Sequence, residues 1–329
     1  MTLRDYVLKS RGLEKPRAAL VADIVDSLAG AGRTIAREVR RAALEGTTGY
    51  AGGENITGDR QKKLDIAGNN VVLDAFRKGG PIAAIISEED DEPVPTATPD
   101  APFVLCTDPI DGSSNTDIDG PLGTIFSISH RRAASPVPQG SDIAASGYIL
   151  YGPSTILALS AGDGAAAFTL DEDRGAWVAT HPALRCPPSG RTFSANLGRQ
   201  REWHPHLRAW LDWVTDSDAA SGRPYSLRYI GSLCADLHRC FIEGGLYFYP
   251  PDHKNKDGKL RLLYECAPLA FLAEQAGGRA STGAMRILEV QATQPHQRSP
   301  LVLGSADEVA RFEAFMSTGK PPQREVKRS

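Results

Sequence analysis

The chain has 329 residues, of which 41% are hydrophobic and 23% are charged, as in an ordinary globular protein with two domains or one large α/β unit. Its formal net charge of −3 provides no basic field, so we expect neither nucleic acid nor a membrane as a partner. The five cysteines are scattered and no run of 18 apolar residues occurs, which argues against a disulfide scaffold, a cysteine zinc site and a transmembrane helix. We expect a cytoplasmic protein.

The first third of the chain predicts two helices separated by a loop. Residues 18–44 place apolar side chains at helical spacing, so we expect one long amphipathic helix, or two helices broken near Gly30 and Gly32. The glycine-rich residues 46–58 show no sustained period and predict a mobile loop. A second amphipathic helix begins just before Asp65.

Strands are predicted in both halves of the chain. The apolar runs 82–86 and 103–106 end in polar residues, and short runs between 148 and 178 predict an antiparallel meander. Past residue 185, helices and strands alternate. We therefore expect an α/β (α+β layered) fold, in which helical layers alternate with mixed sheets, and a domain boundary near residue 185.

The polar turn after the run 103–106 is the strongest chemical signal. Asp108 and Asp111 are three residues apart on a turn that contains proline and glycine, so their carboxylates can point to one place, beside the backbone carbonyl of Ile110. Such oxygen donors suit Mg²⁺ or Mn²⁺. The following Gly112-Ser113-Ser114 offers backbone N–H groups and hydroxyls that suit a phosphate oxygen.

A second acidic pair, Glu88-Glu89, ends the strand predicted at 82–86. Taken alone, this pair is typical of a solvated acidic loop. Two neighbouring strands, however, would bring it to the same sheet edge as Asp108 and Asp111, where four carboxylates repel one another unless cations lie between them. Together the two pairs predict a metal centre.

The segment from Asp108 to Asn115 resembles the signature of the lithium-sensitive, magnesium-dependent phosphatase superfamily, which inositol monophosphatases and bisphosphate nucleotidases share. Longer segments are similar to class I fructose-1,6-bisphosphatase and follow one another in that family's order: 57–65, 87–90, 123–126, 228–232, 258–266 and 296–298. The string from Lys259 to Cys266 is the most specific of them. The resemblance implies the sugar phosphatase fold.

The resemblance also implies a metal-dependent mechanism. Two or three Mg²⁺ ions per subunit, with Mn²⁺ as a substitute, would be held by Glu88, Glu89, Asp108, Asp111, Glu265 and the carbonyl of Ile110. Asp65 and Glu89 would orient the water that attacks the 1-phosphate of fructose 1,6-bisphosphate in line, giving fructose 6-phosphate and phosphate, in gluconeogenesis or the Calvin cycle. On its residues alone, Asp65 is equally well explained as an acid near a helix N-terminus.

The resemblance divides the chain into residues 1–185, with the metal site and a vestigial allosteric site, and residues 186–329, which bind the sugar bisphosphate. It implies a homo-oligomer, expected to be a tetramer. The substrate-binding residues that it implies are Asp111, Gly112, Ser113, Ser114, Asn196, Tyr229, Tyr247, Phe248, Tyr249 and Lys259, with Arg228 from a neighbouring subunit.

Three departures from the family pattern stand out. Arg199 replaces a tyrosine of the distal phosphate site, which leaves the strength and selectivity of that contact open. Sedoheptulose-1,7-bisphosphatase or dual specificity is the alternative, because the same metal centre would serve a sugar one carbon longer. The cysteine-bearing insertion of the chloroplast enzymes is absent. The residues Arg17 to Ala22, Pro102-Phe103 and His130 lack the hydroxyls, the ammonium and the phenol of the family's AMP site, so we expect weak or no AMP inhibition. A non-catalytic phosphosugar sensor is the alternative of another class, and it would lack a metal carboxylate.

Overall fold

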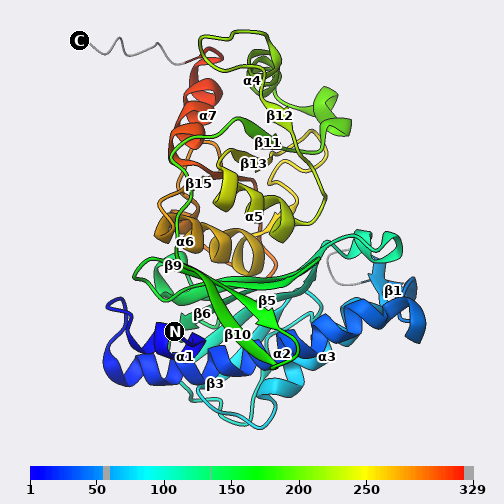
Figure 1. The fold of residues 1–329 in the computed structure, drawn as a ribbon, viewed down its shortest axis with the longest axis vertical. Coiled ribbons are helices and arrows are strands. Elements are labelled where there is room, and N and C mark those ends of the chain that lie inside the picture. Colours follow the sequence, from blue (N-terminus) through cyan, green and yellow to red (C-terminus); the bar gives the residue numbers. More distant parts are fainter. Residues whose placement is uncertain (55–59, 134, 322–329) are drawn as a thin grey trace.

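The computed structural model describes residues 1–54, 60–133 and 135–321 and consists of helix and sheet layers stacked along the long axis (Figure 1). The helices are α1 (Leu3–Leu8), α2 (Lys15–Glu45), α3 (Lys63–Phe76), α4 (Pro205–Thr215), α5 (Leu233–Glu243), α6 (Ala267–Gln275) and α7 (Ala306–Thr318), and a 3-10 helix, η1, spans Ser113–Ile118. None of the helices in these ranges is both long and apolar enough to cross a membrane.

The N-terminal half forms an eight-stranded sheet. Its strands are β3 (Ile82–Ser87), β4 (Val94–Pro95), β5 (Phe103–Asp111), β6 (Leu122–His130), β7 (Ile143–Tyr151), β8 (Thr155–Ser160), β9 (Ala165–Asp171) and β10 (Ala176–Leu184). They lie in the order β10-β9-β8-β7-β6-β5-β3-β4, and only β3 and β5 pair in parallel. The predicted meander is confirmed as β7 to β10, although β7 begins earlier, at Ile143.

The helix α2 is a single helix, so the alternative of two helices is wrong. It lies along one face of the eight-stranded sheet with α1 and α3 (Figure 1). A Cβ atom on Gly32 would lie 2.3 Å from Cδ1 of Ile149 in β7. This glycine therefore lets helix and sheet approach closely, and the packing gained keeps the helix continuous through it.

The predicted loop at 46–58 is wrong in part. Its segment β1 (Tyr50–Glu54) pairs antiparallel with β2 (Arg60–Lys62), just before α3. The strand β1 could not be predicted from its glycine-rich composition, because it is formed by backbone pairing with β2 and has no alternating pattern of side chains. Residues 55–58 of the predicted loop lie outside the described part of the chain.

The C-terminal half forms a five-stranded sheet, ordered β12-β11-β13-β17-β15. Its strands are β11 (Thr192–Ser194), β12 (Ser226–Leu227), β13 (Leu246–Tyr249), β15 (Arg279–Ser281) and β17 (Leu301–Gly304), and a separate pair joins β14 (Leu260–Arg261) to β16 (Arg298–Ser299). The change of sheet between β10 and β11 supports the proposed division near residue 185.

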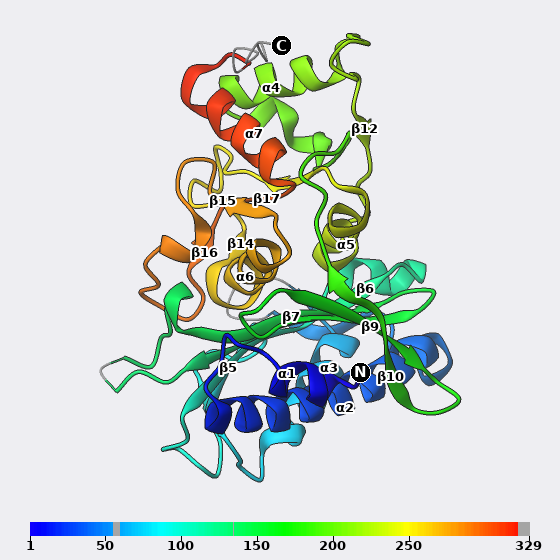
Figure 2. The same cartoon turned by 60° about the vertical axis from the view of Figure 1, so that its left-hand side comes forward.

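The two sheets share one interior layer, formed by α5 and α6 (Figures 1 and 2). Helices α4 and α7 cover the other face of the five-stranded sheet around Trp210 and Phe248. All five cysteines are buried and unpaired. The expected alternation of helical and sheet layers is confirmed, and α5 reaches the edge of the first sheet where β5 ends.

Candidate active site

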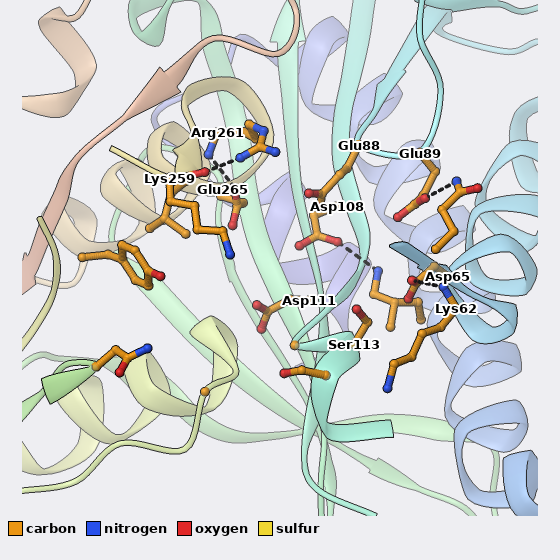
Figure 3. Close-up of a pocket in the computed structure, with 18 of the residues that line it drawn as sticks. Lys62, Asp65, Glu88, Glu89, Asp108, Asp111, Ser113, Lys259, Arg261 and Glu265 are labelled. Atoms are coloured by element: carbon orange, nitrogen blue, oxygen red, sulfur yellow. Dashed lines mark hydrogen bonds between the residues drawn. The ribbon is translucent and has the colours of Figure 1, made fainter. Parts of the chain in front are cut away.

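A cleft of about 610 Å³ lies at this junction. Most of the predicted site residues line it: Asp65, Glu88, Glu89, Asp108, Ile110, Asp111, Gly112, Ser113, Ser114, Asn196, Tyr229, Tyr249, Lys259 and Glu265. Figure 3 shows the carboxylates of Glu88, Glu89, Asp108, Asp111 and Glu265 around the cleft, with Glu265 beside Lys259 and Arg261 on the side away from Asp65 and Lys62. The structure thus brings together residues that are up to 200 positions apart in the chain.

Parallel pairing of β3 with β5 brings the two acidic strand ends together. Ser87 lies opposite Thr107, and the backbone N–H of Glu88 donates to the Thr107 carbonyl at 3.1 Å. Glu88 is therefore the lateral neighbour of Asp108. Burial, and then the charge of Glu88, raise the pKa of Asp108 well above its ordinary value, because an anion is disfavoured both away from water and beside another anion.

The N-terminus of α5 orients Asp111. The Ser232 hydroxyl donates to Oδ2 at 2.8 Å, and the backbone N–H groups of Leu233 and Cys234 donate at 3.0 and 2.8 Å. Burial raises the pKa of Asp111 and these donors oppose the rise. An aspartate of the first half of the chain is thereby held by the positive end of a helix from the second half.

Gly112 makes this contact possible. Its φ of 77° lies in the left-handed region, and an added Cβ would meet Ser232 at 2.7 Å from its Cβ and 3.0 Å from its Cα. Only glycine meets both requirements without strain. The metal turn and the start of α5 can therefore touch.

Glu265 enters from a single π-helical turn, Leu262–Cys266, that leads into α6. Its Oε2 accepts the backbone N–H of Arg261 at 2.5 Å. The guanidinium of Arg261 in turn donates to the carbonyl of Lys259. The wide turn places three consecutive cleft-lining residues, 259 to 261, next to the buried carboxylate of Glu265. Turns of π-helix are frequent at functional sites.

Asp65 lies in the first turn of α3, where its Oδ2 accepts the backbone N–H of Lys62 at 2.8 Å. Its Oδ1 is buried and has no hydrogen-bond partner among the described residues. Burial raises the pKa of Asp65 to about 6. This side chain therefore caps the helix and also presents one oxygen, unpaired among the described residues, beside the cleft.

Other residues of the cleft provide neutral donors and one cation. Asn196, Tyr229 and Tyr249 line the cleft together with Lys259. Burial and the nearby Tyr249 raise the pKa of Tyr229 to about 12, so its phenol keeps its proton and can donate. Amide, phenol and ammonium groups suit a second phosphate.

Three predicted substrate residues do not line the cleft. Phe248 packs against Trp203 and Trp210 on the far face of β13, because neighbouring residues of a strand point to opposite sides. Tyr247 shares the side of Tyr249 but is buried at 3% exposure. The structure corrects both predictions. Arg228 is exposed and donates to the carbonyl of Leu227.

Arg199 also lies beside the cleft and not in it. Its Nη1 contacts Asp252 at 3.1 Å and Glu202 at 3.4 Å. It borders a small crevice that shares Asn196 and Tyr249 with the cleft. The guanidinium is therefore close to these two residues of the cleft but held by two acids.

Six lining residues of the cleft were not predicted from the sequence: Tyr50, Gln61, Lys62, Gly231, Leu260 and Arg261. Gln61 donates to Glu89 at 2.5 Å, and the buried Lys62 forms an ion pair with the exposed Asp117 at 2.9 Å. The lysine and arginine belong to segments that resemble the family, so a signal existed. Tyr50 had none, because it lies in the glycine-rich stretch.

The donor set fits a divalent cation. No three His, Cys, Asp or Glu side chains within the described ranges are already placed to hold a metal ion, so binding would require side-chain rotation. Five carboxylates nevertheless face one cleft, and their mutual repulsion contributes to the raised pKa of Asp108. Oxygen donors of this kind suit Mg²⁺ or Mn²⁺ and not softer metals.

Two family models match the chain. One, described as fructose-1-6-bisphosphatase, N-terminal domain, covers residues 1–182, and the other, described as its C-terminal domain, covers residues 186–317. The chain belongs to the fructose-1,6-bisphosphatase family. The family models meet close to the change of sheet between β10 and β11.

Named relatives narrow the family to class 1. The chain is 46% identical over 308 residues to "Fructose-1,6-bisphosphatase class 1 2" of Acaryochloris marina, with 91% of this chain and 92% of the relative covered. It is 39% identical to the class 1 enzyme of Chlorobaculum parvum, with 95% and 97% covered. The crystal structure of Leishmania major fructose-1,6-bisphosphatase in holo form has a TM-score of 0.89 and 33% identity, with 96% and 99% covered. The resemblance and fold class stated from the sequence are thereby confirmed.

The positions predicted to have lost the family's AMP site form a compact cluster. The ring of His130 lies 5.1 Å from that of Phe103 at 31°. Burial, and then the charge of Arg17, lower the pKa of His130. The imidazole of His130 is thus neutral at physiological pH, and it packs against the phenyl ring of Phe103.

Proposed function

We propose that this protein hydrolyses the 1-phosphate of fructose 1,6-bisphosphate to fructose 6-phosphate and phosphate. One observation carries the proposal beyond family membership: the same cleft is lined by five carboxylates and by a group of phenol, amide and ammonium donors. The carboxylates suit cations around a reacting phosphate, and the donors suit a phosphate that does not react. A substrate with a phosphate at each end fits both.

In this proposal, Glu88, Glu89, Asp108, Asp111 and Glu265 hold two or three Mg²⁺ ions, which when bound neutralise phosphate charge and activate water. The chain's own residues do the rest. Ser113 and Ser114 offer donors to the reacting phosphate, and Asn196, Tyr229, Tyr249 and Lys259 hold the distal one. Water attacks phosphorus, the P–O1 bond breaks, and the sugar oxygen takes up a proton.

We assign the proton acceptor to Asp65 Oδ1, with Glu89 as the second candidate. The Oδ1 atom is unpaired among the described residues while Oδ2 stays bonded to the helix backbone. A pKa of about 6 leaves most of this group ionised at neutral pH yet basic enough to take a proton from the water.

The position of Arg199 is the reason to test sedoheptulose 1,7-bisphosphate as an alternative substrate. A sugar one carbon longer would place its distal phosphate farther from the carboxylates, and Arg199 lines a small crevice together with Asn196 and Tyr249. Phosphate release from fructose 1,6-bisphosphate and sedoheptulose 1,7-bisphosphate should be compared with Mg²⁺ and with chelator. Release from neither substrate in Mg²⁺ would overturn the proposal and favour a non-catalytic sensor.

We further propose that the protein acts in the cytoplasm as a homotetramer in which Arg228 reaches a neighbouring cleft. Its exposed position outside its own cleft supports this role. Unpaired, buried cysteines support a reducing compartment.

A further inference from the structure

A second cavity, of about 450 Å³, lies between α2, η1 and the turn that joins β7 to β8. Within the described ranges, it shares no lining residue with the active-site cleft. Its volume is in the range of sites for small molecules, which run from about 300 to 1,000 Å³. We propose that this cavity is an effector site for a small, mostly apolar monoanion, and that Tyr151 links it to the metal turn.

A hydrogen-bonded relay leads from the cavity wall to a metal carboxylate. The Thr124 hydroxyl donates to the Pro109 carbonyl at 2.7 Å and lies 2.8 Å from the Tyr151 hydroxyl. The Thr124 hydroxyl has one hydrogen, and the hydrogen bond to the Pro109 carbonyl uses it. In the contact between the two hydroxyls, Tyr151 must therefore be the donor and Thr124 the acceptor. On the other side of the same peptide group, the N–H of Ile110 donates to Asp108 Oδ1 at 3.0 Å.

This relay is buried along its whole length, and Tyr151 itself lines the cavity. Successive hydrogen bonds polarise one another, more strongly away from water. A ligand that moves the tyrosine hydroxyl would therefore change the acceptor strength and the position of the Asp108 carboxylate. No side chain needs to travel from one site to the other.

The helix η1 forms a second connection between the two sites. Ser113 and Ser114, at its start, line the active-site cleft, whereas Thr116 lines the cavity. Thr116 is 5% exposed, and its hydroxyl has no hydrogen-bond partner among the residues that the structure describes. A bound acceptor could pair with this hydroxyl after rotation about χ1, which removes the cost of leaving it unpaired.

The lining indicates the chemical class of the ligand. The floor is apolar and buried, with Ala36 and Leu122 at 2% and 1% exposure. Arg40 and Asp119, the two charged side chains of the lining, both lie at the exposed rim. The contacts of Arg40 with Thr155 (2.8 Å) and Glu172 (2.6 Å) both use Nη2. The Nε and Nη1 groups can thus donate to a carboxylate while those contacts stay in place.

Binding can be tested without any assay of activity. The probe is 2-naphthoate, titrated into the full metal-free chain by calorimetry. Arg40→Gln, and replacement of the probe by its methyl ester, should each weaken binding about tenfold, since each removes one charge of the pair. Ala36→Phe should abolish binding by filling the floor. Arg41→Gln is the matched control, because Arg41 pairs with Glu45 instead, and it should leave affinity unchanged.

The link to the metal turn rests on the proposed metal-dependent function and is tested by reciprocity. Mn²⁺ affinity, measured by electron paramagnetic resonance, should change by about fivefold or more with saturating probe, and probe affinity should change by the same factor with saturating Mn²⁺. Tyr151→Phe should keep probe binding but bring this factor to one. Tyr148→Phe removes another buried β7 hydroxyl, one that contacts His238, and should keep the factor.

Each negative result has its own meaning. Absence of probe binding at millimolar concentration would overturn the effector site. Binding with equal Mn²⁺ affinity in its presence and absence, or an unchanged factor in Tyr151→Phe, would overturn the relay. Failure of Mn²⁺ to bind in the absence of the probe would count against the proposed metal centre, and it is read from a separate titration.

Discussion

Replacing Gly112 by alanine tests whether contact between the metal turn and α5 builds the active site. An L-residue in the left-handed region costs about 1–2 kcal/mol. The new Cβ would also lie 2.7 Å from Ser232 Cβ and 3.0 Å from its Cα, well inside the usual separation of about 3.5–4.0 Å between carbon atoms. Overpacking of this kind costs about 1–3 kcal/mol. We therefore expect Gly112→Ala to lower the free energy of unfolding by about 2–5 kcal/mol.

Gly46 provides a matched control. Its φ is 69°, and a Cβ added there meets no atom of the described residues within 4 Å. Gly46→Ala should therefore cost only the conformational part, about 1–2 kcal/mol. Urea unfolding gives both free energies, and Mn²⁺ titration reports whether Asp111 has lost its place beside Ser232. Equal costs for the two variants, with unchanged Mn²⁺ affinity in Gly112→Ala, would refute the reasoning.

Four further outcomes follow from the structure. Chelation should abolish phosphate release and Mg²⁺ restore it, and Asp111→Ala should lower kcat by several orders of magnitude; full activity of that variant in chelator would contradict the metal mechanism. Burial lowers the pKa of His238 from 6.5 to about 4. Between these two pH values, His238 is therefore protonated in the unfolded chain and neutral in the folded chain. The free energy of unfolding should accordingly fall by up to roughly 3 kcal/mol as the pH drops from 6.5 to 4, and His238→Gln should flatten that slope; an equal slope in both proteins would show another group responsible. AMP at millimolar concentration should leave activity nearly unchanged because His130 offers no charge, whereas half-inhibition at micromolar AMP would disprove the loss of that site. Light scattering should report an assembly larger than one chain, and a purely 35.3 kDa species with full activity would rule out a shared Arg228.

Much of the active site could be predicted from short stretches of sequence. Acids that directly follow apolar runs mark strand ends, and neighbouring strands bring such ends to one edge, so Glu88 and Asp108 were placed correctly as neighbours. The resemblance then added Glu265 and the distal residues, which no local pattern identifies. The prediction failed for Phe248, because period-two alternation tells which residues share a face but not which face meets the cleft.

The sequence by itself determined the features that depend on a residue and its near neighbours in the chain: the carboxylates of the metal turn, the amphipathic helices, the meander and the family. Tertiary structure alone decided how Asp111 is held, since its three donors lie more than 120 residues away. It also decided that α2 runs unbroken past Gly32 and that Tyr151 is connected to Asp108. The physical reason is the same in each case: hydrogen bonds and close packing act over a few ångströms of space, and only the folded chain brings such distant residues within that range.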